Sequence, residues 1–249
     1  MLKFFRNIRQ TLIMENKTTK YFKYAIGEIV LVVIGILIAL QINNWNETRK
    51  NRTFEVKMLK EIKKALENDI SSFERSKFRL HMLDSATNVM AKHIYEQSTF
   101  EDSLYYKGES RWYYLRTGIQ YQYNRGPYEA IKSSGIDKIS NDSLRNDLIK
   151  LYDFDFPRNE ELTKWFDRDY EKQNEKLSSF LSEAEVILNN GEYDFVRTFP
   201  ENLFNNKEFI TLVGSIRRRG KSVSNSLSTM IKRMELMIAH IDREINHKK

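Results

Sequence analysis

The stretch Tyr24–Ile42 constrains the fold of this chain more than any other. It reads YAIGEIVLVVIGILIALQI and contains one ionisable residue, Glu28. At a rise of about 1.5 Å per residue, a helix of this length reaches close to 30 Å, roughly the hydrocarbon thickness of a bilayer. The sequence therefore predicts a transmembrane helix over residues 24–42. The lipid bilayer is its first expected partner, and all later residues lie on one side of the membrane.

The flank before the span is basic. Residues 1–23 hold six Lys or Arg residues and one Glu, with Phe5, Ile8 and Leu12 on one helical stripe. Two interpretations stay open: an amphipathic helix lying on an anionic leaflet, or a flank that only orients the span. Both place residues 1–23 at the cytoplasmic face.

The apolar run is not followed by a small-x-small cleavage site, so we expect an uncleaved signal anchor. We predict a single-pass protein of the inner (plasma) membrane with its C-terminal domain in the periplasm. Five Lys or Arg residues between positions 49 and 60 follow the span, so the excess of basic residues on its N-terminal side, which supports this orientation, is small.

One face of the span is predicted to contact another helix. At 100° per residue, Glu28, Val32, Gly35 and Ala39 lie within about 40° of one line. Gly35 and Ala39 form a small-x-x-x-small pair, which lets a second helix approach closely. We therefore expect a homo-oligomer, or pairing with a partner membrane protein, through this face. Glu28 either joins that contact or extends to the headgroups.

Two segments carry a family resemblance. Residues 24–47, YAIGEIVLVVIGILIALQINNWNE, resemble the signature of the bacterial domain-of-unknown-function family 6090. Residues 124–153 are similar to that family's second recurring segment. The resemblance implies a single-span protein with a helical region after the span, and it implies no activity because none is established for the family.

Residues 43–249 are predicted to form one helical extramembrane domain. No Gly or Pro occurs between the span and Gly108, and apolar residues recur every three or four positions from Leu59 to Ile94. This spacing favours a long helix with a coiled-coil-like seam, continuing from the span.

Further helices are expected after Pro127, from Asn141 or Asp142 to Pro157, from about Asn159 to Asn190, and from about Asn206 to the C-terminus. A loop is expected between the last two. The fold class is therefore all-α: one N-terminal transmembrane helix followed by an antiparallel helical bundle. An aromatic-rich insert, about residues 98–140, is expected to pack across one end of that bundle. We also expect it to include a short hairpin or a helical cap near Gly108.

The sequence carries no recognised catalytic motif. Cysteine is absent, and the four histidines lack the spacing of a chelating pair. We expect no catalytic residue, no metal and no cofactor. The net charge of +7 resides at the two ends, since residues 1–23 carry +5, residues 207–249 carry +6 and residues 24–206 carry −4. We therefore expect no nucleic-acid partner, and we interpret the basic run 217–221 as a solvated helix face.

The strongest candidate for a recognition patch is the aromatic and basic part of the insert. Its residues are Trp112, Tyr113, Arg116, Tyr121 and Arg125. Rings and guanidinium groups are efficient at recognition, although the same rings could instead cap the bundle core. The preferred function is a membrane-anchored, non-enzymatic, extracytoplasmic domain for protein or ligand interaction. The alternatives are an enzyme with an unrecognised site and a structural envelope tether.

Overall fold

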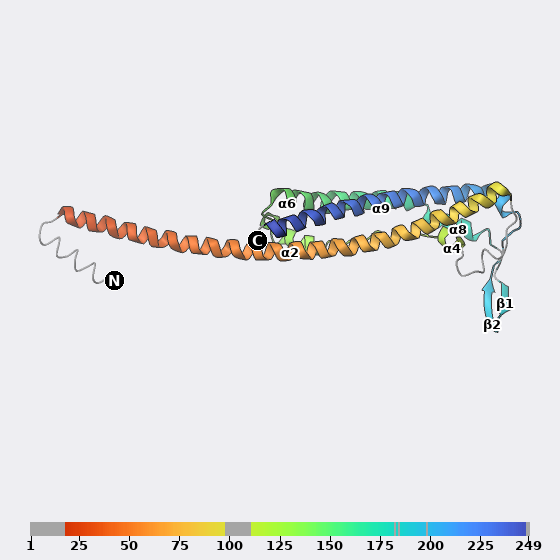
Figure 1. Ribbon diagram of the computed structural model, residues 1–249, viewed down its shortest axis with the longest axis horizontal. Coiled ribbons are helices and arrows are strands. Elements are labelled where there is room, and N and C mark those ends of the chain that lie inside the picture. The colour runs from red at the N-terminus through yellow and green to blue at the C-terminus, as the bar shows by residue number, and fades with distance from the viewer. Residues whose placement is uncertain (1–17, 98–110, 182, 184, 198, 248–249) are drawn as a thin grey trace. The chain divides into compact units, whose positions relative to one another are not determined.

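The structure, a computed structural model, describes residues 18–97, 111–181, 183, 185–197 and 199–247. The chain divides into two compact units, Met1–Glu55 and Val56–Lys249. Helix α2 (Thr18–Glu96) belongs to both units and is uninterrupted, as the absence of Gly and Pro between the span and Gly108 predicted (Figure 1).

In the first unit, α2 holds the apolar stretch. An 18-residue window reaches a mean hydropathy of 2.6, and no part of this window is buried by the rest of the protein. The side chains of Leu31 and Leu37 are 65% and 59% exposed. By length and composition this helix can cross a membrane. The predicted amphipathic character of the basic flank concerns residues 1–23, of which residues 1–17 lie outside the described part.

The second unit is an antiparallel helical bundle. Helix α9 (Lys207–His247) runs against α2, with Lys63 paired to Asp242 at 2.7 Å and Asp84 paired to Arg217 at 3.1 Å. The third layer is a chain of four helical segments, which are α6 (Asp142–Ile149), η2 (Lys150–Asp155), α7 (Phe156–Asp167) and α8 (Tyr170–Ser178). Figure 1 shows these layers side by side. The predicted all-α class is confirmed.

The core of the bundle follows the predicted apolar seams. On α2 the fully buried side chains recur at three- or four-residue steps or multiples of them: Leu59, Ile62, Leu66, Phe73, Leu80, Leu83 and Met90. On α9 the matching set is Phe209, Ile216, Val223, Leu227, Met230, Met234 and Ile241. Burial of these two stripes in the core stabilises the unit, at about 25 cal/mol per Å² of apolar surface removed from water.

Several helix boundaries form where the sequence predicted them. Helix α5 (Gly126–Ser133) starts with Pro127 in its first turn, and Gly135 follows it with a φ of 106°. The side chain of Asn141 caps α6 by accepting a hydrogen bond from the backbone N–H of Leu144 at 3.1 Å. Asn206 caps α9 in the same way. The remaining short helices are α4 (Arg111–Leu115), η1 (Ile136–Lys138) and η3 (Leu203–Asn205).

The expectation that Pro157 breaks the helix is wrong. The segment η2 is a π-helix that joins α6 to α7 without a gap, and Pro157 lies directly after it, in the first turn of α7. A π-helix holds more residues per turn than an α-helix, so it rotates the face that follows. As a result, Asn159 and Thr163 face α9, whereas Leu162 and Trp165 are 43% and 56% exposed.

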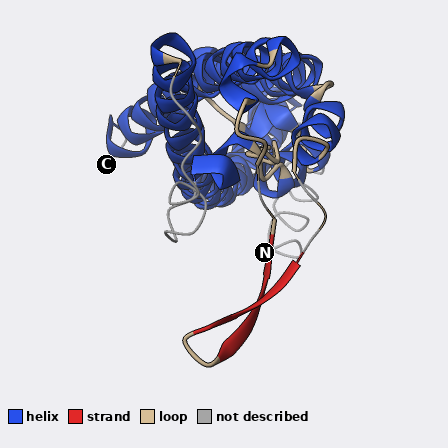
Figure 2. Ribbon diagram, turned by 90° about the vertical axis from the view of Figure 1, so that its right-hand side faces the viewer, coloured by secondary structure: helices blue, strands red, loops and turns tan. Residues whose placement is uncertain are grey.

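The expected helix to Asn190, with a loop after it, is also wrong. The helices of this region end at Ser178, and a hairpin follows, made of β1 (Glu185–Asn189) and β2 (Glu192–Val196). Its turn is Asn190–Gly191, with φ values of 49° and 86°. Such a two-residue turn with positive φ values matches the twist of the flanking strands. Figure 2 shows the hairpin extending away from the helices.

The described part of the insert, residues 111–140, lies along the bundle and not across one end. Trp112 packs in the core cluster that contains Met90 of α2. Asn124 lies further back along the same helix, where its backbone N–H donates to Asp69 at 3.0 Å. Further on, Asn141 donates to Glu244 near the end of α9. The predicted hairpin or cap near Gly108 concerns residues 98–110, outside the described part.

Candidate functional site

The structure separates the five predicted patch residues into two groups. Trp112 is 5% exposed and stands edge-on to Phe199, with ring centroids 4.4 Å apart. Tyr121 is partly buried against Phe73, with ring centroids 5.0 Å apart. These two rings therefore belong to the packing of the bundle.

The other three patch residues are more accessible. Arg125 forms an ion pair with Glu129 at 2.9 Å and lies 3.6 Å from Asp153. Tyr113 is 69% exposed, and Arg116 is also exposed. Of the predicted patch, Tyr113 and Arg116 remain as neighbouring side chains that face solvent.

Tyr113 and Arg116 line a groove between α2, α4, the chain after α4 and α8. The groove consists of two adjoining hollows of about 520 and 540 Å³, which share Arg79, Tyr113 and Tyr114. We call it the arginine–tyrosine groove. It is defined by Arg75, Arg79, Tyr113, Tyr114, Arg116 and Tyr170.

The charged side chains that line this groove are mainly positive. Arg75, Arg79 and Arg116 are exposed, and no ion pair of their side chains occurs within the described part of the chain. Arg75 and Arg79 are four residues apart on α2, so they share one face. The carboxylate that lines the groove, Asp167, is already paired to Arg219. Within the described residues, the groove is therefore cationic and presents planar guanidinium donors.

Arg219 organises the wall of the groove from inside the bundle. Its guanidinium donates to Asp167 Oδ1 at 2.6 Å, to Gln173 Oε1 at 2.9 Å and to the backbone carbonyl of Thr117 at 2.9 Å. The residue is 6% exposed, and Tyr170 stacks over its charge at 5.2 Å. One buried cation thus ties α7, α8 and α9 to the chain that carries Arg116.

Tyr170 holds the same chain from the other side. Its hydroxyl donates to the backbone carbonyl of Arg116 at 3.0 Å. Its ring lies against Gly118 so closely that a Cβ at this position would come within 2.6 Å of the ring. Glycine is therefore required here for the close approach of the backbone. These contacts hold the backbone on which the Arg116 side chain enters the groove.

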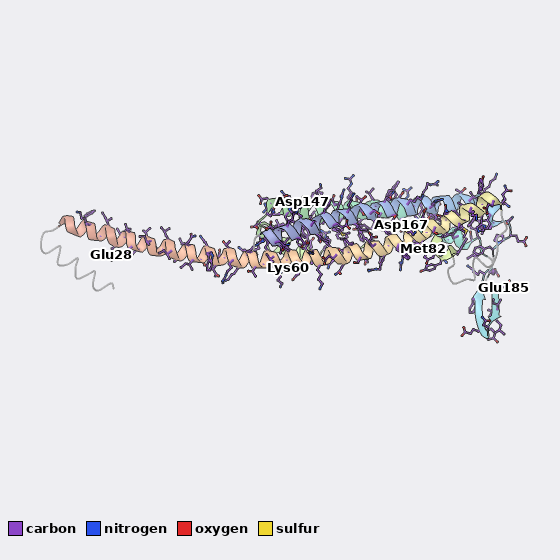
Figure 3. All side chains as sticks on the ribbon, in the orientation of Figure 1. Glu28, Lys60, Met82, Asp147, Asp167 and Glu185 are labelled. Carbon is purple, nitrogen blue, oxygen red and sulfur yellow. The ribbon has the colours of Figure 1, made fainter. Side chains whose placement is uncertain are left out.

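Two opposing effects act on the pKa of the Asp167 carboxyl. Burial raises the pKa of its carboxyl above the ordinary value, while the neighbouring Arg219 guanidinium pulls the pKa down by charge and hydrogen bonding. The two groups are 18% and 4% exposed. The pair is consequently a structural element of the bundle (Figure 3 labels Asp167).

On the span, the predicted contact face stays uncovered by the rest of the chain. Val32 is 57% exposed, and a Cβ built on Gly35 would meet no atom within 4 Å. Ala39 is exposed as well. Glu28 is half-buried. Val32, Gly35 and Ala39 thus remain accessible to a second helix.

Sequence reasoning missed Arg219 because it lies in a basic run that we interpreted as a solvated face. The two arginines before it are more accessible: Arg217 pairs with Asp84, and Arg218 is exposed. A signal was present: position 219 falls between Ile216 and Val223 on the buried stripe of α9. A charged residue on such a stripe is buried only with partners.

The histidines do not contribute to the groove. The His93 ring stacks on Phe204, and His240 Nδ1 lies 3.0 Å from Asp147 Oδ2. Among the described residues, no group of three or more His, Asp or Glu side chains is close enough to hold a metal ion.

Comparison with known proteins gives a family and no individual relative. The model of a family described as "Family of unknown function (DUF6090)" matches residues 28–198, which is more than half of the chain. No match was found among the curated proteins or the solved structures. The matched range begins within the apolar stretch and includes the groove residues of α2, α4 and α8. This chain therefore belongs to the DUF6090 family, whose function is unknown.

Proposed function

We propose that this protein is a membrane-anchored, non-enzymatic binding domain that takes an anionic ligand in the arginine–tyrosine groove. The observation that supports this most is the set of three exposed arginines, without ion pairs within the described residues, around two adjoining hollows. Guanidinium groups bind carboxylate and phosphate oxygens through two parallel hydrogen bonds. Tyr113 and Tyr114 add rigid contact area beside them.

The alternative of an enzyme has less support in the same geometry. Acid–base chemistry commonly uses two titratable groups placed on either side of a reacting bond. The arginine–tyrosine groove has one carboxylate, Asp167, and its Oδ1 already accepts a hydrogen bond from the Arg219 guanidinium. A hollow of about 450 Å³ between α7 and α9 also holds one carboxylate, Asp155, paired with Arg233.

The binding proposal is tested with the full chain in nonionic detergent and two labelled peptides, polyglutamate and polylysine. We expect binding of polyglutamate alone, weakened by salt because exposed charges are screened. Arg79→Gln and Arg116→Gln should each weaken it by about tenfold, since a charge-assisted hydrogen bond contributes about 1.5–3 kcal/mol.

Arg218→Gln is the matched control, because Arg218 is an exposed arginine on α9 outside the groove. Its affinity for polyglutamate should equal that of the wild type. Equal weakening by Arg79→Gln and Arg218→Gln would show that net charge, and not the groove, binds the peptide. Inorganic phosphate as a competitor distinguishes a phosphate site from a carboxylate site.

The proposed location is the inner membrane, with the bundle in the periplasm. Its support is the basic flank before the span and the length of the apolar stretch. A C-terminal alkaline phosphatase fusion should be active, and an inactive fusion would reverse the orientation.

We further propose that the span pairs with a second span through the face of Glu28, Val32, Gly35 and Ala39. Gly35→Leu with Ala39→Leu should reduce pairing in a transmembrane reporter assay, because larger side chains keep the helices apart. Gly27→Leu, which also enlarges a small residue but lies outside this face, is the matched control. Pairing that survives the double change would remove this face from the proposal.

A further inference from the structure

The hairpin of β1 and β2 carries an apolar face that no part of the described chain covers. Cross-strand partners are Val186 with Phe195 and Leu188 with Tyr193, so these four side chains share one face. Their exposed fractions are 58%, 75%, 66% and 78% in that order. A two-stranded hairpin is marginal in water by itself, and an exposed apolar face of this composition is typical of interaction surfaces.

We propose that this face, the hairpin face of Val186, Leu188, Tyr193 and Phe195, docks on the same face of a second copy of this chain. The support is the symmetry of its residues. If two hairpins lie face to face about a two-fold axis parallel to the strands, β1 of each copy faces β2 of the other. Because each aliphatic residue is paired across the hairpin with an aromatic one, Leu188 then faces Tyr193 of the second copy, and Val186 faces Phe195.

This arrangement places small side chains against large ones over the whole face. Facing layers pack best when large and small residues alternate in this way. The opposite face of the hairpin includes Glu185 and Glu192, which are exposed and stay in water in this dimer (Figure 3 labels Glu185). The two-fold arrangement therefore buries the apolar face and leaves these carboxylates solvated.

Charge disfavours an anionic bilayer surface as the occupant of the hairpin face. From Glu183 to Val196 the chain has four carboxylates and no basic residue. An anionic leaflet attracts Lys and Arg clusters and repels such a segment. The hairpin face is therefore unlike the basic apolar surfaces that bind membranes.

The area is sufficient for a weak contact. An aromatic side chain buries about 150–250 Å² when fully covered, so Tyr193 and Phe195, about three-quarters exposed, offer roughly 300 Å² together. With Val186 and Leu188, two facing hairpins bury at most on the order of 900 Å² in total, which is the size of a weak or transient interface. Chains tethered in one bilayer meet at a high effective concentration, which favours a contact of this size. This last step rests on the anchoring proposed above.

Cross-linking between two full-length chains tests the proposal, since the native sequence has no cysteine. One tagged chain carries Leu188→Cys and a differently tagged chain carries Tyr193→Cys, and both are placed in the same membranes with a short bismaleimide. We expect a cross-linked product with both tags. Val186→Cys with Phe195→Cys should give the same product. Glu185→Cys with Glu192→Cys, on the opposite face, is the matched control and should give little.

A competition arm separates docking from collision. Excess untagged wild-type chain should remove the product, whereas excess Phe195→Ser chain should not. Phe195 lies outside the bundle core, so the helical circular dichroism of the variant should equal that of the wild type. Failure of the phosphatase test of orientation leaves this pattern intact, because it requires only that two copies share a membrane.

Three results would overturn the proposal. The first is no product at the facing pairs, and the second is equal product at the control pair. The third is quenching of a fluorophore on Leu188→Cys by brominated lipids, which would place the hairpin face on the bilayer.

Discussion

Replacing Asp69 with asparagine should stabilise the bundle at neutral pH and leave its stability in acid unchanged. Asp69 is 7% exposed, and its two carboxylate oxygens share one bifurcated hydrogen bond from the backbone N–H of Asn124, at 3.0 and 3.2 Å. Burial raises the pKa of this carboxyl from 3.8 to about 6, although the hydrogen bond from Asn124 opposes the shift. The rings of Tyr121 and Tyr152 lie near it and supply no positive charge.

The sign follows from proton binding. Because the folded pKa of Asp69 exceeds the unfolded value, the folded state binds more protons between about pH 4 and pH 6. The free energy of unfolding therefore falls as the pH rises through this window, and the loss is complete above the folded pKa. A shift of about two units corresponds to roughly 3 kcal/mol. Asparagine removes this loss and keeps an acceptor for the N–H of Asn124.

The assay is urea unfolding of the full chain in nonionic detergent from pH 4 to pH 8, followed by tryptophan fluorescence. Asp69→Asn should exceed the wild type by up to about 3 kcal/mol at pH 8 and converge with it near pH 4. A variant that is less stable than the wild type at pH 8, or a difference that is independent of pH, would refute the reasoning.

Asp153→Asn is the control of opposite sign. Burial alone would raise the pKa of Asp153, but hydrogen bonds from Lys132 and Tyr128 lower it overall. The stability that Asp153 contributes is therefore present at neutral pH and lost as the pH falls through its folded pKa. Asp153→Asn should destabilise the bundle at pH 8 and converge with the wild type in acid.

Three further predictions concern α9. Gly214→Ala should raise the free energy of unfolding by about 0.5–1 kcal/mol, because its Cβ meets no atom within 4 Å and alanine is the better helix former. Gly220→Ala should gain less or lose stability in the same urea assay, since its Cβ would come within 2.7 Å of the Leu83 side chain. Arg219→Met should cost about 3–5 kcal/mol by leaving Asp167 buried without its partner, and adding Asp167→Leu should recover part of that loss; no recovery would contradict the pairing.

The long helices were predictable because their signal is regular and repeated. On α2 and α9 the apolar residues recur at helical spacing over many turns, and few competing patterns fit such a run. Local caps such as Asn141 were equally readable, since a side-chain acceptor before an apolar run satisfies the free N–H groups of a helix start. These parts of the fold follow from short-range physics.

The errors share a different cause, which is tertiary context. The π-helix η2 has no signal in the helical spacing of the sequence, and it rotates α7 away from the face that Leu162 indicated. Its Tyr152 packs on Tyr128, a contact with another segment of the chain, with ring centroids 4.5 Å apart. The hairpin had a local signal in Asn190–Gly191, but the helical spacing before it masked the alternation. In the groove, Tyr113 and Arg116 were found from composition, whereas Arg75 and Arg79 come from α2, which is distant in sequence. Arg219, which supports the wall of the groove from inside the bundle, comes from α9.

The antiparallel pairing of α2 with α9 also dictates when the bundle can form. Lys63 and Asp242 are separated by 179 residues and Asp84 and Arg217 by 133, so the seam of α2 finds its partner only at the end of the chain. During synthesis the apolar stripe from Leu59 to Met90 emerges long before the helix that covers it. Closure of such distant contacts is slow, and an early fragment exposes aggregation-prone surface. The nascent domain therefore stays open until α9 is made.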